Sequence, residues 1–478
     1  MSNWLFAVIA VPFASAAIMA LLPAYRLTAI INVLASALTL AAGIGLLWSP
    51  NGADDYFVLD EVNIVFIVLN TLVGFTAAWF SASYIGHEIE TGRITQRSVR
   101  FYHAMYQCML GAMNVALLAN NIGLLWVGLE LATLITVIMV GLYRTPEAIE
   151  AAWKYFILGS VGISLAFFGT ILAYLAGQQA LGDGMPAMSW TLLYANAARL
   201  DVPLLNLAFV FLLVGYGTKV GLAPLHAWLP DAHSEGPTPI SAVLSGLLLN
   251  VALYALLRFK MLIAANPEAL RPGPVLVVMG LVSLLFAAFM LYPRRDAKRL
   301  FAYSSIEHMG LITFAFGMGG PLANFAGLLH MAMHSLTKSA IFFAVGHVAQ
   351  AKGTQRLADI RGLSVSHPGL AIGLAAGVMA IAGLPPFGVF MSEFLILTTT
   401  FARDPWLALL PAIGLVVAFG ALVMRLQGML FGTPSEPNHK VKASPIPFIL
   451  HLLLVLAAGL YLPGALAAWF HKAAELLG

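Results

Sequence analysis

Long apolar runs follow one another along the whole chain, separated by short polar segments. A helix needs about 20 apolar residues to cross the hydrocarbon core of a bilayer. The runs are continuous and do not alternate apolar with polar residues, as the strands of an outer-membrane barrel do. The pattern predicts an all-α polytopic membrane protein. We expect about fourteen transmembrane helices, at residues 4–22, 27–48, 62–85, 103–119, 121–142, 153–177, 203–226, 237–262, 273–292, 298–317, 321–350, 367–401, 405–431 and 445–471.

Two of these helices contain glycine and proline near their middles. The seventh contains GTKVGLAP at 217–224, and the twelfth contains GLPPFG at 383–388. Backbone that leaves the helix at membrane depth is tolerated only where protein or a water-filled cavity surrounds it. Broken helices at matching positions of two halves are typical of transport proteins. An ionisable residue accompanies each break, Lys219 at the first and Glu393 at the second.

The two broken helices are five apart in the predicted order, which indicates an internal repeat. Helices 4–8 and 9–13 then form two five-helix repeats, and an odd number of helices inverts the second relative to the first. The chain is expected to be a single membrane domain, residues 1–478. Its predicted parts are helices 1–3 (1–100), the first repeat (101–264), the second repeat (265–432) and helix 14 (433–478).

Composition agrees with the membrane interpretation. Hydrophobic residues make up 60% of the chain and charged residues 9%, and the mean hydropathy is +0.90, which is far from the values of water-soluble domains. Cys108 is the one cysteine. An intrachain disulfide is therefore excluded, and the chain cannot supply the four thiolates that an iron–sulfur cluster normally takes. We expect any such cluster on another subunit.

Lysine and arginine are concentrated in the loops that follow odd-numbered helices. Those loops and the adjoining helix ends hold most of the 24 basic residues, and the predicted helices leave only Lys219 and Lys338 inside the membrane. By the positive-inside rule, both termini lie on the non-cytoplasmic face. The first apolar run has no basic segment before it and further spans follow, so we interpret it as a retained helix.

Lys219 and Glu130 are the first candidates for ion movement. A lysine left charged against lipid costs at least about 3 kcal/mol, so Lys219 must face protein or water. Glu130 is the one charged residue of helix 5 and is the natural counter-charge. A nearby carboxylate holds a lysine protonated, and separating the two releases the proton. The alternative is an ion pair with a purely structural role.

Helix 11 carries a row of titratable residues. His330, His334 and Lys338 follow one another at i, i+4 spacing, on one helix face and about 6 Å apart along the axis. Such a row can pass a proton along with intervening water. The alternative for each histidine is a hydrogen-bonded core residue.

Helix 10 contains Glu307 and His308 in YSSIEHMG. Neighbouring residues point about 100° apart around a helix, so we expect that the two do not face the same channel. His308 is predicted to face inward, with Glu307 as a partner for a neighbouring base. Glu393 follows the second break, where water can reach free backbone groups, and is predicted to end the proton path. The alternative is a structural tie between Glu393 and Lys338.

The linker HAWLPDAHSEGP has residue types that bind metals, but its spacing matches no zinc signature. We expect a hydrogen-bonded turn at the cytoplasmic mouth, with His226 and His233 as candidate relay or access residues. His334 and His347 are thirteen residues apart on helix 11, as in a bis-histidine haem protein, but no second helix has a matching pair. No metal or cofactor site is therefore predicted in this chain.

Four sequence strings resemble a known family: KVGLAPLHAWLPDAHSEGPTPISA, YSSIEHMG, HSLTKS and GLPPFGVFMSEF. They are similar to the antiporter-like, proton-translocating subunits of respiratory complex I and group 4 nickel–iron hydrogenases, and most of all to component F of hydrogenase 4. The resemblance covers helices 4–13. It implies a fourteen-helix bundle with two inverted five-helix repeats, in the cytoplasmic (inner) membrane of a prokaryote.

The resemblance also implies roles for individual residues. Glu130 and Lys219 match the helix 5 and helix 7 pair of the family, His308 and His334 match central histidines, and Glu393 matches the terminal carboxylate of helix 12. Asn250 departs from the pattern, because related subunits often have a lysine in helix 8. An amide holds water but does not change charge, so water must bridge this step.

The predicted function is therefore proton translocation by a membrane subunit of a hydrogenase-type or complex I-type redox complex. The expected partners are other membrane and peripheral subunits, which would carry the iron–sulfur and nickel–iron centres, and no nucleic acid is expected. Three alternatives remain. They are a cation/proton antiporter subunit of the Mrp type that moves Na⁺, a haem- or quinone-binding subunit, and a passive membrane anchor in which the polar residues are vestigial.

Overall fold

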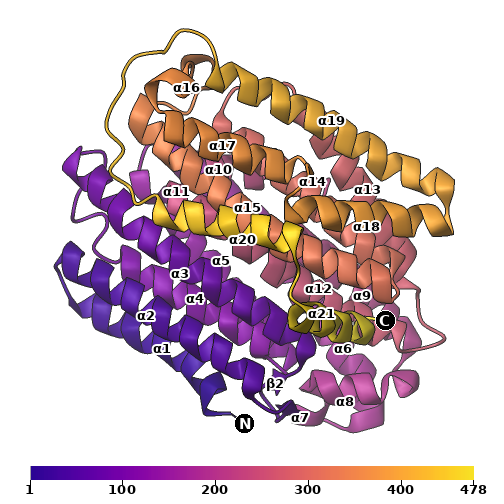
Figure 1. Cartoon of the computed structure of the whole chain (residues 1–478). Coiled ribbons are helices and arrows are strands. Elements are labelled where there is room, and N and C mark those ends of the chain that lie inside the picture. The colour runs from indigo at the N-terminus through magenta and orange to yellow at the C-terminus, as the bar shows by residue number, and fades with distance from the viewer. Residues whose placement is uncertain (1) are drawn as a thin grey trace.

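The computed structural model describes residues 2–478 and consists mainly of long helices packed side by side (Figure 1). The N-terminal part contains α1 (Asn3–Leu21), α2 (Tyr25–Gly45), α3 (Glu61–Glu90), α4 (Tyr102–Leu118), α5 (Ile122–Val140), α6 (Pro146–Leu181), α7 (Met185–Met188), α8 (Trp190–Ala195), α9 (Val202–Val220), α10 (Leu229–Glu235), α11 (Thr238–Val243) and α12 (Leu249–Ala264). The rest contains α13 (Pro272–Met290), α14 (Ala297–Met318), α15 (Pro321–Lys352), α16 (Leu363–Ser366), α17 (Pro368–Ile381), α18 (Gly388–Arg403), α19 (Pro405–Leu430), α20 (Ile446–Leu460) and α21 (Gly464–Leu476). A two-residue hairpin pairs β1 (Gly52–Ala53) antiparallel with β2 (Val58–Leu59), with Gly52 opposite Leu59.

Many of the helices are suited to a bilayer. Within residues 2–478, ten are long and apolar enough to cross a membrane, and the bent pair α20 and α21 raises the number to eleven if it forms one span. The predicted fold class, an all-α polytopic membrane protein, is confirmed. The number of fourteen spans and the division into inverted repeats stay predictions.

The least and the most apolar of the candidate spans differ in burial. Helix α15 is the least apolar of the candidate spans, and its most apolar stretch is wholly buried, whereas α19 is the most apolar and only a third buried. Lipid is as apolar as a leucine side chain, so apolar helices lose nothing by facing it, while polar side chains need protein or water around them. The polar residues of α15 therefore lie at the centre of the molecule.

Both predicted helix breaks are present. Helix α9 ends at Val220 and is capped by Gly221 in the left-handed conformation (φ 81°), and the next helix begins at Leu229. The break starts four residues later than 217, so Lys219 lies in the last turn of α9. The second break separates α17 from α18, with Gly383 at φ 69°.

The predicted helix 14 is wrong as a single element. It divides into α20 and α21, which are bent by 84° relative to each other. Proline lacks an amide hydrogen and its ring clashes with the preceding helical turn, and Pro463 stands directly before α21. Figure 1 shows α20 (yellow) crossing the middle of the molecule in front of α15, with the N-terminal helices (indigo) on one side and α19 on the other.

Two further helices differ locally from the prediction. Helix α6 begins at Pro146 rather than at 153, because the Thr145 side chain caps it by accepting a hydrogen bond from the amide of Ala148 and proline suits the first helical position. The predicted helix 8 contains one π-helical turn, Leu244–Leu248, between α11 and α12. Such turns free backbone carbonyls and often occur at functional sites.

Candidate functional site

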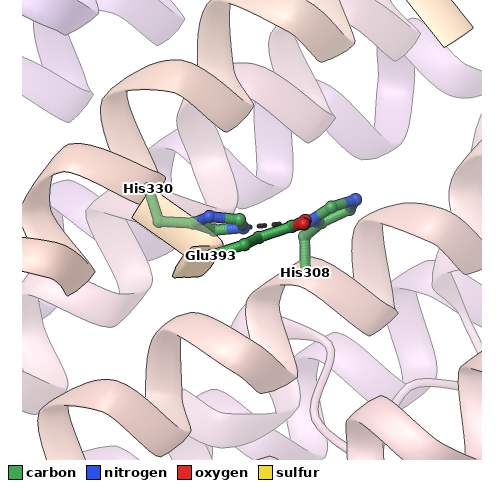
Figure 2. A group of neighbouring side chains, drawn as sticks. All are labelled: His308, His330 and Glu393. Atoms are coloured by element: carbon green, nitrogen blue, oxygen red, sulfur yellow. Dashed lines mark hydrogen bonds and ion pairs between the residues drawn. The ribbon is translucent and has the colours of Figure 1, made fainter. Parts of the chain in front are cut away.

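Three residues from three different helices meet in the second half of the chain. His308 of α14, His330 of α15 and Glu393 of α18 point toward one another (Figure 2). Nδ1 of His308 lies 2.9 Å from Nε2 of His330 and 3.9 Å from Oε1 of Glu393. The exposed fraction is 1% for His308, 0% for His330 and 7% for Glu393. Titratable groups are thus concentrated where lipid and water are both largely excluded.

Other polar side chains extend this group. Oε2 of Glu307 lies 3.3 Å from Nε2 of His308, and Oγ of Ser392 is hydrogen-bonded to Nδ1 of His330 at 2.9 Å. The His334 ring centroid is 5.5 Å from that of His308. Neither His334 nitrogen has a hydrogen-bond partner among the described residues. We call Glu307, His308, His330, His334 and Glu393 the histidine–glutamate cluster.

The structure corrects the expectation that Glu307 and His308 cannot face the same channel. The two residues are adjacent on α14, yet their side chains approach within 3.3 Å and both are buried. Long side chains can bend toward each other although their Cβ atoms point about 100° apart. The role of Glu307 as a partner for a neighbouring base stays a prediction, and His308 is the base that lies beside it.

Lys338 lies two turns beyond His330 on the unbroken helix α15, so the predicted i, i+4 row is present. Its Nζ donates a hydrogen bond to the carbonyl oxygen of Phe301 at 3.2 Å and lies 5.8 Å from the centroid of the Phe301 ring. No ion pair joins Lys338 to Glu393 within residues 2–478. The alternative of a structural ion pair between Lys338 and Glu393 is therefore not formed.

The second break holds Glu393 in place. Gly383 has a left-handed backbone (φ 69°), and a Cβ at that position would overlap the carboxylate of Glu393. The carboxylate consequently lies against the unwound backbone between α17 and α18. This contact explains why a glycine stands there, since it satisfies both the backbone conformation and the close approach.

Glu130 and Lys219 form a second, separate group in the first half of the chain. Lys219 is 1% exposed, and its Nζ packs beside Gly159 of α6 and lies 5.7 Å from the centroid of the Tyr155 ring. Glu130 of α5 is half-buried. The described residues contain no ion pair between them, and both Nζ of Lys219 and Oε2 of Glu130 lack a hydrogen-bond partner. The predicted pair is near but not in contact.

Asn250 lies between the two groups in the chain and reaches α15. Its Nδ2 donates to Oγ of Ser335 at 2.5 Å and to the carbonyl of Gly246 at 3.0 Å. Gly246 belongs to the π-helical turn, and its carbonyl accepts the hydrogen bond from Asn250. Oδ1 of Asn250 is buried without a partner within residues 2–478. The amide therefore joins α12 to the residue that follows His334.

The two linker histidines lie apart from the histidine–glutamate cluster. The ring of His233 stacks on that of Phe342 at 4.8 Å, and His226 packs against Phe286 at 4.8 Å. His233 is fully buried and His226 is 8% exposed. Their predicted role as relay or access residues stays a prediction.

Sequence reasoning missed several buried basic residues. Besides Lys219 and Lys338, the structure buries four more that the predicted boundaries placed in loops or at helix ends: Arg258, Lys260, Lys298 and Lys352. Three donate to backbone carbonyls, namely those of Leu477, Gly236 and Ser435. Arg258 pairs with Asp60 at 2.7 Å. Hydropathy does not reveal these contacts, because each partner is distant in sequence.

Ser335 and Ser392 were also missed. Ser335 directly follows His334, and Ser392 directly precedes Glu393, and both of these neighbours are predicted site residues. A serine next to a titratable residue within an apolar run was the sequence feature that could have indicated these two contacts.

The comparisons with known proteins agree with this architecture. Residues 119–419 match the family described as NADH:quinone oxidoreductase/Mrp antiporter, TM. The match covers more than half of the chain, and the chain belongs to this family. It is 58% identical over 471 residues to a hydrogenase-4 component F homolog of Methylacidiphilum infernorum (isolate V4), which covers 98% of this chain and 99% of that relative.

Solved structures show the same fold. A chain of the membrane-bound sulfane sulfur reductase (MBS), an archaeal respiratory membrane complex, superposes with a TM-score of 0.88 at 23% identity, over 100% of this chain and 98% of that one. A chain of respiratory complex I from Thermus thermophilus gives a TM-score of 0.84 at 23% identity, over 99% and 100%. The family match and the relative with 58% identity confirm the resemblance to antiporter-like membrane subunits, and the chain is an integral membrane protein.

Proposed function

We propose that this chain is the proton-translocating membrane subunit of a hydrogenase-type or complex I-type redox complex. The observation that carries the proposal is the histidine–glutamate cluster at the centre of a membrane-spanning bundle. Buried polar groups without partners cost free energy, and ionisable residues inside a membrane mark ion pathways by default. Glu307, His334 and Glu393 all have buried atoms without a hydrogen-bond partner among the described residues.

The proposed path has two titrating parts joined by a polar step. Glu130 and Lys219 form the first part, where separation of the two charges releases a proton from the lysine. Asn250 and Ser335 provide the step, and water carries the proton across it. Lys338 and the histidine–glutamate cluster form the second part, which ends at Glu393 beside the unwound backbone. Each of these side chains is buried or half-buried.

Electron transfer belongs to partner subunits in this proposal. The relative with 58% identity is described as a hydrogenase-4 component F homolog, which favours a hydrogenase-type partner. Nickel–iron and iron–sulfur centres are proposed on the partners, in keeping with the single cysteine of this chain. The proposed location is a prokaryotic inner membrane, with both termini on the non-cytoplasmic face.

The direct test is the substitution Lys219→Ala in the intact complex, reconstituted in sealed vesicles. Redox-driven charge movement is expected to be lost, while the redox activity of the partner subunits, measured with soluble electron donors and acceptors, remains. Lys472→Ala is the control, because that lysine is exposed on α21. Unchanged charge movement in Lys219→Ala vesicles would refute the proposed role.

A second candidate function is cation/proton antiport of the Mrp type, since the family description names Mrp antiporters beside quinone oxidoreductases. Antiport needs no electron donor. Uptake of ²²Na⁺ into vesicles driven only by a pH gradient would favour this function. Charge movement that requires a redox substrate and is independent of Na⁺ would favour the first.

A further inference from the structure

The histidine–glutamate cluster has the ligand geometry of a metal site. Within residues 2–478, His308, His330 and Glu393 are the group whose donor atoms all lie within 4.8 Å of one another. A zinc ion with bonds of about 2.0–2.1 Å in tetrahedral geometry separates neighbouring ligand atoms by about 3.3 Å. The distances from Nδ1 of His308 are 2.9 Å to Nε2 of His330 and 3.9 Å to Oε1 of Glu393, on either side of that value.

We propose that His308, His330 and Glu393 form a binding site for one divalent first-row transition-metal ion, with Zn²⁺ as the reference ion. Two imidazole nitrogens and one carboxylate oxygen are a ligand set that zinc uses, with a fourth position left for water. Small shifts of the side chains bring the three atoms to bonding distance. Mg²⁺ and Ca²⁺ are disfavoured, because they take six or more oxygen ligands.

The atoms around the ligands fit the same assignment. Histidines that bind metals usually direct their other ring nitrogen at a carboxylate, carbonyl or water, which fixes the orientation of the ring. Glu307 lies 3.3 Å from Nε2 of His308, and Ser392 is hydrogen-bonded to Nδ1 of His330. In both cases the supported nitrogen is the one that faces away from the metal position. The His330 ring is therefore oriented by a hydrogen bond, and the His308 ring has a carboxylate within reach of its other nitrogen.

Charge balance also favours a divalent ion. A buried charge is tolerated only when it is compensated. Zn²⁺ bound by Glu393 and flanked by Glu307, with both carboxylates ionised, leaves no net charge in the cluster. The hydrogen between Nδ1 of His308 and Nε2 of His330 belongs to one of the two neutral rings. On metal binding that ring keeps its hydrogen on its other nitrogen, which faces Glu307 or Ser392. The metal then replaces this hydrogen as the link between the rings.

One consequence rests on the proposed function. If protons pass through Nδ1 of His308 and Nε2 of His330, a metal ion bound to these atoms closes the path. Occupied protein should then lose redox-driven charge movement, and a chelator should restore it.

The site is tested with Co²⁺ bound to the full chain in lipid nanodiscs, because four-coordinate Co²⁺ absorbs visible light much more strongly than the hexaaqua ion. One such Co²⁺ per chain is expected, displaced by Zn²⁺ and not by excess Mg²⁺. His330→Gln and Glu393→Gln should each weaken binding by about 10-fold or more, and Ser392→Ala, which removes a supporting group, by about 10-fold. His347→Gln is the matched control, because His347 is also buried on α15 but lies outside the cluster.

X-ray absorption at the zinc edge provides a measurement that needs no variant. A spectrum of the unmodified chain in which two imidazoles and a carboxylate coordinate the zinc ion supports the site. A six-coordinate spectrum, or equal binding by wild type, His330→Gln and Glu393→Gln, overturns it. If Co²⁺ binds at the three residues while charge movement continues, the metal site is supported and the proton path through His308 is refuted. If no metal binds while protons move normally, the metal site is refuted and the proposed function is supported.

Discussion

At the residue scale, Gly383 and Glu393 show how a single missing side chain shapes the site. The glycine is left-handed and lies directly against the Glu393 carboxylate. Any other residue there would have to displace the carboxylate away from His308 and also adopt a disfavoured backbone conformation. The GLPPFG string marks the break in the sequence, but its first glycine matters because of a contact ten residues further on.

We predict that Gly383→Ala damages both stability and ion movement. A left-handed backbone costs a residue with a Cβ about 1–2 kcal/mol, and the carboxylate must also move. Thermal unfolding in detergent should begin at a lower temperature, and redox-driven charge movement should fall strongly. Gly428→Ala is the control, because a Cβ on this α19 glycine meets nothing within 4 Å. Equal behaviour of the two variants would contradict the account of Gly383.

Asn250 gives a second prediction at this scale. Asn250→Leu removes the hydrogen bonds to Ser335 and Gly246 and with them the polar step between α12 and α15. We expect slower charge movement with little change in the redox activity of the partners, measured in sealed vesicles. Asn250→Gln, which keeps an amide that can donate, should be less impaired than Asn250→Leu. Full activity of the leucine variant would place the path elsewhere or favour a passive anchor.

At the scale of elements, α3 and α12 are joined by an ion pair whose arginine is buried. Asp60 precedes α3 and caps it, its side chain accepting a hydrogen bond from the amide of Asn63. Arg258 of α12 pairs with Asp60 at 2.7 Å, and its guanidinium carbon lies 4.5 Å from the Trp190 ring centroid. Arg258 is 2% exposed. The pair thus links the start of α3 to the middle of α12.

We predict that Asp60→Asn lowers the free energy of unfolding by about 3 kcal/mol, the lower value typical of breaking a buried pair. Asparagine is a good helix cap, so the substitution removes the charge and keeps the cap. The measurement is thermal or denaturant unfolding in detergent. Glu90→Gln serves as the comparison, because Glu90 and Lys442 form a pair at 2.8 Å in which both side chains are more than half exposed. That variant should change stability little, and a similar loss in both would contradict the distinction.

At the scale of the whole molecule, the bundle is arranged with its polar helix at the centre. His308 of α14 is hydrogen-bonded to His330 of α15 and lies beside Glu393 of α18. Asn250 of α12 donates a hydrogen bond to Ser335 of α15. Helix α15 therefore contacts every part of the second half of the proposed path. The charged loops lie at the ends of the helices, and their distribution predicts the orientation in the bilayer.

The orientation is tested by labelling single cysteines in a Cys108→Ser background. Asp55→Cys lies in the loop before α3, and Lys440→Cys lies in the loop between α19 and α20. Both native side chains are exposed. With non-cytoplasmic termini, a membrane-impermeant maleimide added to intact cells labels Asp55→Cys, and it reaches Lys440→Cys only after the membrane is permeabilised. The reverse pattern would show that the predicted orientation is wrong.

The sequence by itself determined that this is a helical membrane protein with two broken helices and a set of buried titratable residues. These conclusions depend on local properties. Lipid selects long apolar runs, glycine and proline interrupt helices wherever they stand, and the i, i+4 spacing alone places His330, His334 and Lys338 on one face. Such properties are present before the helices pack.

Only the tertiary structure decided which of those residues meet. Rotation of each helix about its axis and the choice of side-chain rotamers are set by packing, which a single sequence does not show. Packing brings Glu307 to His308, keeps Lys338 away from Glu393, leaves Glu130 and Lys219 out of contact, and buries Arg258 against Asp60. The convergence of His308, His330 and Glu393 depends on three helices at once, and for that reason it emerged only from the folded chain.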